Sequence, residues 1–189
     1  MKKNILFKGP LLTRSGYGEQ SRFAFRALRE RSDLFNLYIQ PLQWGKTSWI
    51  AEEDEERAWI DQAIEKTIAF IQSGGTFDAS FQVTIPNEWE KLAPINIGFT
   101  AGIESTKVAY PWIEKGNEMD RIVVVSNHSK EVYNETVYIG THPETGEEVQ
   151  ARLQTPIDAV NYPVKTFEPI ELDLDLKHDV NFLCVAQYG

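Results

Sequence analysis

Two glycines near the amino end of the chain stand where a phosphate or carboxylate could bind. Gly16 and Gly18 flank Tyr17 in a polar loop between an apolar run and a predicted helix. Glycine permits positive φ and close backbone approach, and the free amides and positive dipole at a helix start attract anions. Arg14 lies beside this loop in the sequence. The loop is therefore the best local candidate for an anion site.

Three arginines on the predicted helix share one face because they repeat at helical spacing: Arg22, Arg26 and Arg29. Two interpretations stay open for them. They complete the anion site, or they form a solvated basic face beside a turn that is only structural, since short Gly-x-Gly matches are weak evidence.

Polar groups also follow two predicted strands further along the chain. Thr100 and Glu104 follow the strand Ile95–Thr100, and Ser126, Asn127 and His128 end or follow the strand Arg121–Ser126. Ligands of open α/β sheets bind outside the carboxyl ends of the strands, so we expect these groups and the glycine loop to line one crevice. Ser129 is equally typical of a helix N-cap.

Other chemistries have little support. A dinucleotide site would need a third glycine where Ser21 stands, and an acidic residue near Tyr38 and Gln40. The three histidines lie far apart, without the spacing of a metal pair: His128, His142 and His178. No serine forms a Gly-x-Ser-x-Gly elbow. The loop residues Trp44 and Trp49 could stack on sugars if they are exposed.

Short apolar runs alternate with helical patterns, which predicts an α/β fold with a mostly parallel, doubly wound, Rossmann-like sheet. The predicted strands are Asn4–Lys8, Phe35–Gln40, Asp78–Val83, Ile95–Thr100 and Arg121–Ser126. The predicted helices run from about Glu19 to Arg31, from the acidic run Glu52–Glu56 to Gly74, around Trp112, and over Ser129–Asn134. In the second helix, the apolar stripe from Trp59 and Ile60 to Ile68 and Ile71 is expected to face the core. Val137–Leu153 alternates apolar and polar residues and predicts an inserted β-hairpin that projects as an arm.

Charge and cysteine content limit the partners and the cellular compartment that we expect for the protein. The 189 residues carry a formal charge of −9, and positive charge is concentrated in residues 1–31. So acidic a body disfavours nucleic-acid binding. The chain has a single cysteine, Cys184, and its start lacks the apolar core of a signal peptide. We therefore expect a cytoplasmic protein.

The domain prediction divides the chain unequally. Residues 1–165 form the Rossmann-like domain with the hairpin at 137–153, and residues 166–179 form an acidic linker with prolines. Residues 180–189 then begin another α/β unit, with Val180–Ala186 as its first strand, so we expect a truncated chain.

The order of these signals resembles the amino-terminal half of a GT-B glycosyltransferase, most of all the retaining enzymes of glycosyltransferase family four. The resemblance rests on these segments: Gly9-Pro10, Ser15–Gly18, Gly98–Thr100 with Glu104 ahead of Trp112, Asn117–Ser126, Asn161–Val164 and Phe182–Ala186. Where that family often has a histidine, this chain has Gln82, Val83 and Thr84.

The resemblance implies transfer of a sugar from a nucleotide-sugar donor to a carbohydrate or other hydroxyl acceptor, which includes acceptors held at a membrane surface. It implies no metal and no cofactor, leaves the catalytic residues unknown, and assigns most donor contacts to a second domain. Gly16, Tyr17 and Gly18 would lie near the donor phosphate or sugar. The candidates for acceptor binding are Arg14, Thr100, Glu104, Ser126, Asn127 and His128.

Two other classes remain. A free-standing α/β module could use the same crevice for an anionic ligand or a protein partner, with the Val137–Leu153 arm mediating association. A nicotinamide-dependent dehydrogenase domain is the weaker alternative and predicts saturable NAD binding.

Overall fold

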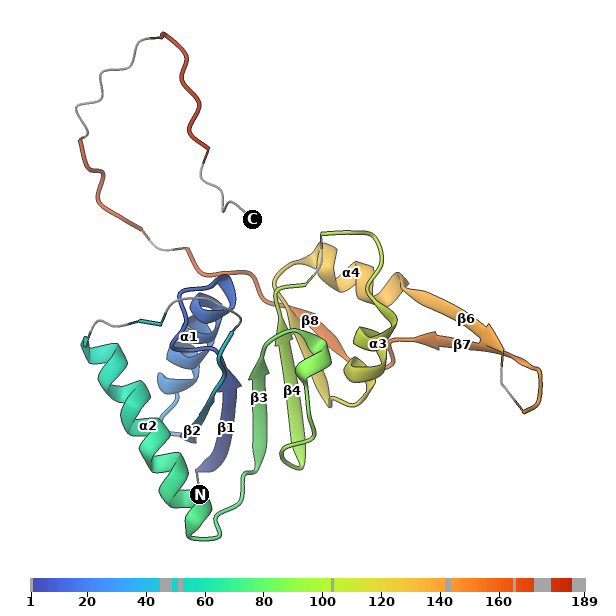
Figure 1. Ribbon diagram of the computed structural model, residues 1–189, viewed down its shortest axis with the longest axis horizontal. Coiled ribbons are helices and arrows are strands. Elements are labelled where there is room, and N and C mark those ends of the chain that lie inside the picture. Colours follow the sequence, from blue (N-terminus) through green and yellow to red (C-terminus); the bar gives the residue numbers. More distant parts are fainter. Residues whose placement is uncertain are drawn as a thin grey trace.

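The computed structural model describes residues 2–44, 49–50, 53–102, 104–141, 144–164, 166–171 and 178–184. Within these ranges a six-stranded parallel sheet has the order β2-β1-β3-β4-β5-β8 (Figure 1). Its strands are β1 (Lys3–Gly9), β2 (Phe35–Pro41), β3 (Ala79–Val83), β4 (Ile95–Thr100), β5 (Arg121–Val124) and β8 (Ile157–Ala159). The prediction of a Rossmann-like, doubly wound α/β fold is confirmed.

The two faces of the sheet carry separate cores, because successive strand residues point to opposite faces. The helices are α1 (Gly16–Arg29), α2 (Glu55–Gln72), α3 (Tyr110–Asn117) and α4 (Asn127–Glu135), with a 3-10 turn η1 (Pro86–Glu88). In β5, Ile122 and Val124 pack with residues of α3 and α4. The neighbouring Val123 belongs instead to the core that contains Phe25 of α1. This alternation makes the sheet the central layer of the fold.

The strand order has one switch point, between β1 and β3. The chain leaves β1 through α1 to reach β2 on one side, and α2 then carries it back past β1 to β3 on the other side. The loops that follow β1 and β3 therefore diverge above the same pair of strands. In open α/β sheets this is the position at which ligands bind.

Helix α2 covers the outer edge of β2. The Thr67 hydroxyl accepts a hydrogen bond from the Ile39 amide at 2.7 Å, and the Phe70 ring stacks on Tyr38 at 4.3 Å between centroids. The prediction that the whole apolar stripe of α2 faces the core is wrong, because its last two residues, Ile68 and Ile71, are more than half exposed. Thr67 and Phe70 make the contacts with the edge strand instead.

The hairpin is confirmed: β6 (Val137–Thr141) pairs antiparallel with β7 (Glu148–Arg152). Strand β8 was not predicted, because three residues are too few to show a period. The strand expected over Val180–Ala186 is absent from the described residues 178–184, since a strand needs a hydrogen-bonding neighbour and this stretch has none in the described chain. Its last residues lie outside the described ranges, and residues 166–171 form no helix or strand. None of the described helices has the length and apolar character needed to cross a bilayer.

The edge contact at Thr67 gives a stability prediction. Thr67→Val keeps the shape of the side chain but leaves the buried Ile39 amide without an acceptor. Such an unsatisfied group costs about 1–3 kcal/mol, so we expect the free energy of unfolding in urea to fall by that amount. Ser73→Ala, at the exposed end of α2, is the control and should change it by less than about 0.5 kcal/mol. Equal effects of the two substitutions would contradict the edge role.

Candidate functional site at the carboxyl edge of the sheet

The two glycines lie inside helix α1, not in a loop before it. Ser15 is the N-cap, its hydroxyl accepts from the Gly18 amide at 3.0 Å, and the helix begins at Gly16. The predicted start near Glu19 is therefore wrong. Positive φ is also not the reason for these glycines, because in the described chain the residues with positive φ are Gly74, Gly102 and Gly146.

Close packing requires Gly18 but not Gly16. A Cβ atom at Gly18 would lie 2.1 Å from the carbonyl oxygen of Thr13, whereas a Cβ atom at Gly16 would have no neighbour within 4 Å. Gly18 thus lets the first turn of α1 press against the loop after β1. The sequence suggested a close approach of the Gly18 backbone to a ligand. In the structure, the Gly18 backbone approaches the loop after β1 instead.

The three arginines of α1 have partners within the chain. Arg22 is buried, and its guanidinium donates to the carbonyl oxygens of Leu11 and Thr13 at 2.7 and 3.0 Å and pairs with Glu19. Arg26 pairs with Glu56 at 2.5 Å in a two-pronged contact, which raises the pKa of that guanidinium. Arg29 lies over the Trp59 ring, 3.2 Å from its centroid. All three arginines thus contact groups of their own chain. Arg22 is buried, whereas Arg29 is exposed, so only part of the predicted solvated basic face is present.

Tyr17 joins the first turn of α1 to the end of β4. Its hydroxyl lies 2.8 Å from the Thr100 hydroxyl and accepts from the Ala101 amide at 3.3 Å. The Trp44 ring packs on Tyr17 with centroids 4.8 Å apart. Burial raises the pKa of Tyr17, a nearby Glu88 carboxylate raises it further, and the two hydrogen bonds oppose that change. Tyr17 is therefore a neutral phenol at physiological pH.

The loop after β3 supplies a carboxylate at the switch point. Glu88 is exposed, and its carboxylate accepts from the buried Thr84 hydroxyl at 2.5 Å. The ammonium group of Lys8, at the end of β1, is buried beneath this loop and donates to the Glu88 carbonyl oxygen at 2.9 Å and to the Glu90 carboxylate at 2.5 Å. These bonds hold the loop so that the Glu88 side chain reaches solvent near Tyr17.

The loops after β4 and β5 also meet at this edge. Gly102 has φ +87°, and a Cβ atom there would lie 2.2 Å from the Ser129 hydroxyl oxygen. The Ser126 hydroxyl accepts from the Ser129 amide at 3.1 Å and lies 3.0 Å from the Ser129 hydroxyl. Ser126 is therefore the N-cap of α4, and the N-cap predicted at Ser129 is wrong by one turn.

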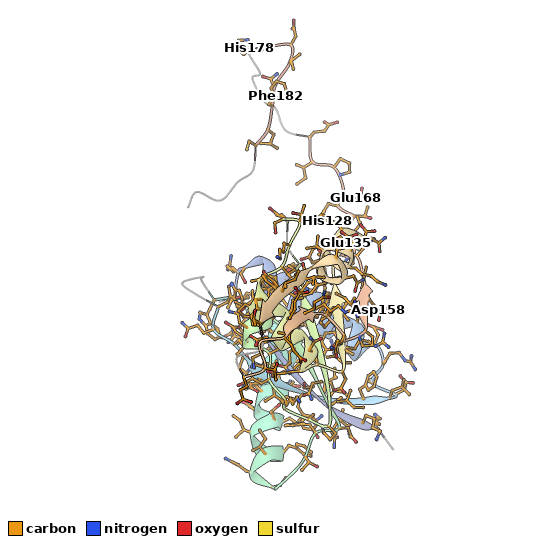
Figure 2. The ribbon with its side chains drawn as sticks, turned by 90° about the vertical axis from the view of Figure 1, so that its right-hand side faces the viewer. His128, Glu135, Asp158, Glu168, His178 and Phe182 are labelled. Carbon is orange, nitrogen blue, oxygen red and sulfur yellow. The ribbon has the colours of Figure 1, made fainter. Side chains whose placement is uncertain are left out.

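The remaining predicted residues lie on the rim. Arg14, Glu104, Asn127 and His128 are all exposed, and Figure 2 shows His128 at the top of the body, the end at which the tail departs. In the described chain, none of the last three makes a side-chain hydrogen bond to Tyr17. The structure thus brings Tyr17 and Thr100 into direct contact and leaves the other candidates around them.

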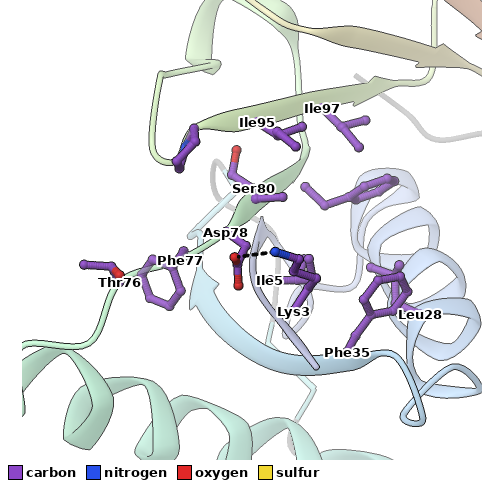
Figure 3. Close-up of a pocket in the computed structure, with 13 residues that line it drawn as sticks. Lys3, Ile5, Leu28, Phe35, Thr76, Phe77, Asp78, Ser80, Ile95 and Ile97 are labelled. Atoms are coloured by element: carbon purple, nitrogen blue, oxygen red, sulfur yellow. Dashed lines mark hydrogen bonds and ion pairs between the residues drawn. The ribbon is translucent and has the colours of Figure 1, made fainter. Parts of the chain in front are cut away.

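A large hollow lies elsewhere in the described chain, toward the amino ends of the strands (Figure 3). It measures about 590 Å³, and most of its lining is apolar, with Ile5, Phe35 and Ile97 among the residues. One ion pair, Lys3 to Asp78 at 3.1 Å, crosses its wall. Because it contains almost no polar chemistry, we do not assign the function to it.

Sequence reasoning missed Glu88 and the contact of Trp44 with Tyr17. The departure from the family pattern at Gln82 and Thr84 was a usable signal, because these residues lie at the carboxyl end of β3, beside the switch point. Gln82 itself is fully buried, and its side-chain amide bonds to both the amide and the carbonyl of Glu90. It therefore holds the loop that presents Glu88 and does not reach a ligand.

The comparisons with known proteins do not assign the chain to a family. No family model matches the chain, and no curated protein or solved structure matches it either. The functional argument therefore rests on the site. Among the described residues, no group of three or more His, Cys, Asp or Glu side chains is placed to hold a metal ion.

We expect substitution by alanine to have opposite effects on stability at Gly18 and at Gly16. Gly18→Ala forces a Cβ atom against the Thr13 backbone, and we expect it to lower the free energy of unfolding by about 2–4 kcal/mol. Gly16→Ala meets open space in a helical turn and should raise it by up to about 1 kcal/mol. Urea unfolding followed by circular dichroism measures both. A tolerated Gly18→Ala would mean that the two segments do not pack as closely as described.

Two tyrosines form a second matched pair. Tyr17→Phe removes the hydroxyl bonded to Thr100 and should cost about 1 kcal/mol. Tyr133 is fully buried, and its hydroxyl has no hydrogen-bond partner in the described chain, so Tyr133→Phe should cost nothing or stabilise. Equal losses in urea unfolding at pH 7 would contradict these assignments.

The burial of Tyr133 also predicts how the stability of the protein changes with pH. Burial raises the pKa of Tyr133 above its ordinary value of 10.0. As pH rises past about 10, the unfolded chain releases this proton first, so stability is complete below pH 10 and is lost above it. We expect Tyr133→Phe to lose less stability than the parent protein between pH 7 and about pH 11. An identical loss would mean that Tyr133 is not buried as a neutral phenol.

Proposed function

We propose that this chain is the acceptor-binding part of a glycosyltransferase that moves a sugar from a nucleotide-sugar donor to an acceptor hydroxyl. The observation that carries the proposal is the group at the switch point: the Tyr17–Thr100 hydrogen bond, the Trp44 ring tilted against Tyr17, and the Glu88 carboxylate, which is near enough to raise the pKa of Tyr17. Aromatic faces and hydroxyl or carboxylate groups together suit a sugar, which has apolar C–H faces and many hydroxyls.

The exposed carboxylates at this edge favour an acceptor that donates hydrogen bonds. Arg22 and Arg26 are paired with carboxylates within the chain, while Glu88 and Glu104 are exposed at the edge. A diphosphate would meet these carboxylates at a cost, whereas sugar hydroxyls can donate hydrogen bonds to them. We therefore assign Tyr17, Thr100 and Glu88 to the acceptor and leave the donor phosphate to another surface of the enzyme.

In transfer, the crevice would orient the acceptor hydroxyl toward the donor sugar. A hydroxyl held in a fixed orientation reacts faster because the entropic cost of orienting it has already been met on binding. Charge grows on the leaving diphosphate in the transition state, and groups outside the described residues would have to stabilise it. A cytoplasmic setting, and an acceptor that is either free or held at a membrane surface, belong to this proposal.

The anion-binding module is the second class. Its support is smaller than the sequence suggested, because Arg22 and Arg26 are paired with carboxylates and Arg29 lies over the Trp59 ring. The dehydrogenase class lacks an acidic residue at the end of β2, where Tyr38 is stacked on Phe70.

An NMR titration of this chain tests the proposal. We expect neutral glycosides to bind with a dissociation constant on the order of 1 mM, about −4 kcal/mol, and to shift the indole N–H of Trp44 and the amides of Tyr17 and Ala101. Tyr17→Ala should abolish these shifts. Tyr110→Ala, at a partly exposed ring on α3, is the matched control and should leave them unchanged.

The two alternative functions predict different experimental results. Shifts of the same amides by inorganic phosphate, without a response to glycosides, would support the anion-binding module. Saturable heat on addition of NAD would support the dehydrogenase. If glycosides bind, a panel of nucleotide sugars then identifies the donor, with Glu88→Gln expected to raise the KM for the acceptor more than it lowers kcat.

A further inference from the structure

The hairpin β6–β7 is a separate two-stranded sheet that projects from the body (Figure 1). In the described chain, each of its strands is paired only with the other. A two-stranded ribbon alone is marginally stable in water, and three or more strands are usually needed. The arm therefore has an unused capacity for strand pairing, which is independent of the proposed function.

The base of the arm is fixed to the body. The Tyr138 hydroxyl donates to the Val108 carbonyl at 2.8 Å, and the Tyr110 ring meets Tyr138 edge-on with centroids 5.5 Å apart. The Lys107 ammonium lies 3.9 Å from the centre of the same ring. These contacts hold the arm by the face that carries Tyr138 and leave its opposite face, with Ile139, to solvent.

Strand β6 has none of the features that protect an edge. Its five residues, Val137–Thr141, include no charged residue and no proline, and Ile139 is 67% exposed. Natural proteins guard such edges with lysine, proline or a covering element, because an open, uncharged strand pairs with another chain. Strand β7 differs: it carries Glu148 and Arg152, and the Arg152 carbonyl accepts from Asn117 of α3 at 2.9 Å. The open edge is therefore that of β6.

We propose that β6 pairs antiparallel with β6 of a second copy of this chain, about a two-fold axis that passes at Ile139. In this register Ile139 faces Ile139 of the other copy, Val137 faces Thr141, and Tyr138 faces Gly140. The solvent-side pairs are β-branched throughout, which is a favourable cross-strand combination. The product is a four-stranded sheet with the order β7-β6-β6-β7.

The pairing pattern of β6 with itself favours a second copy over an unrelated strand, because β-branched residues meet β-branched residues at every solvent-side position. Within one hairpin, Thr141 pairs with Glu148 and Val137 pairs with Arg152. The two-fold register therefore places Glu148 of one copy and Arg152 of the other at opposite ends of the same row, about 14 Å apart, where salt largely screens their attraction. No charged residues face each other directly across the new pairing. The net charge of −9 opposes association as a whole, so salt should tighten the dimer by screening that repulsion.

Sedimentation velocity over a range of protein concentrations tests the pairing. We expect a monomer–dimer equilibrium whose dissociation constant falls when NaCl is added. Ile139→Lys places two ammonium groups across the axis and should weaken the dimer at least tenfold. Gln150→Lys is the matched control, because Gln150 is the exposed partner of Ile139 on β7, and it should leave the equilibrium unchanged. A monomer at every concentration, or a dimer that survives Ile139→Lys, would overturn the proposal.

Cross-linking tests the register directly and does not depend on affinity alone. In a Cys184→Ser background, Ile139→Cys would bring two Cβ atoms about 4.5–5.5 Å apart across the axis, close to the separation that a disulfide spans. We expect a covalent dimer on mild oxidation, and none from Gln150→Cys in the same background, because Gln150 lies on the same face but on the outer strand. Equal cross-linking of both variants would count against the two-fold register. Retained NMR contacts between Tyr110 and Tyr138 would confirm that the variant hairpins are folded.

Discussion

The geometry of the candidate site depends on the buried guanidinium of Arg22. A charge in the interior is tolerated only when it is paired and its donors are bonded. Arg22 meets this requirement by binding Glu19 on its own helix and two carbonyl oxygens, of Leu11 and Thr13, in the loop after β1. The loop is thereby tied to α1, and Gly18 allows the contact to close. That fit aims the Tyr17 hydroxyl at Thr100 on the far side of the switch point.

Much of the fold could be predicted because the sheet is buried on both faces. Runs such as Ile122–Val124 are continuously apolar only when a strand is covered on both sides, and the alternation in Val137–Leu153 correctly predicted the antiparallel arm. The start of α1 was misplaced because Gly-x-Gly normally indicates a loop, whereas here Gly18 satisfies a packing constraint that involves Thr13. Such a constraint is tertiary and leaves no local pattern.

The candidate site could be predicted only in part, for a similar reason. That Tyr17 and Thr100 lie at one edge follows from the parallel strands, and the structure brings them into contact. The position of Glu88 depends on which strands flank β1, and local sequence does not reveal strand order. The arginines of α1 show the reverse error, because spacing alone cannot separate a ligand-binding cation from one bound to Glu56 or stacked on Trp59.

The distribution of charge is what limits the chemistry of this edge. A crevice that binds phosphate needs cations or free amides directed outward, yet Arg22 and Arg26 are paired internally and the Gly18 amide is bonded to Ser15. The groups in contact at the switch point are a neutral phenol and a threonine hydroxyl, with an aromatic ring packed on the phenol and an exposed carboxylate nearby. These groups can orient a hydroxyl-rich molecule, but they cannot neutralise a leaving diphosphate. The proposed transferase would therefore need positive charge from a second surface, and catalysis would wait for that surface to close over the edge.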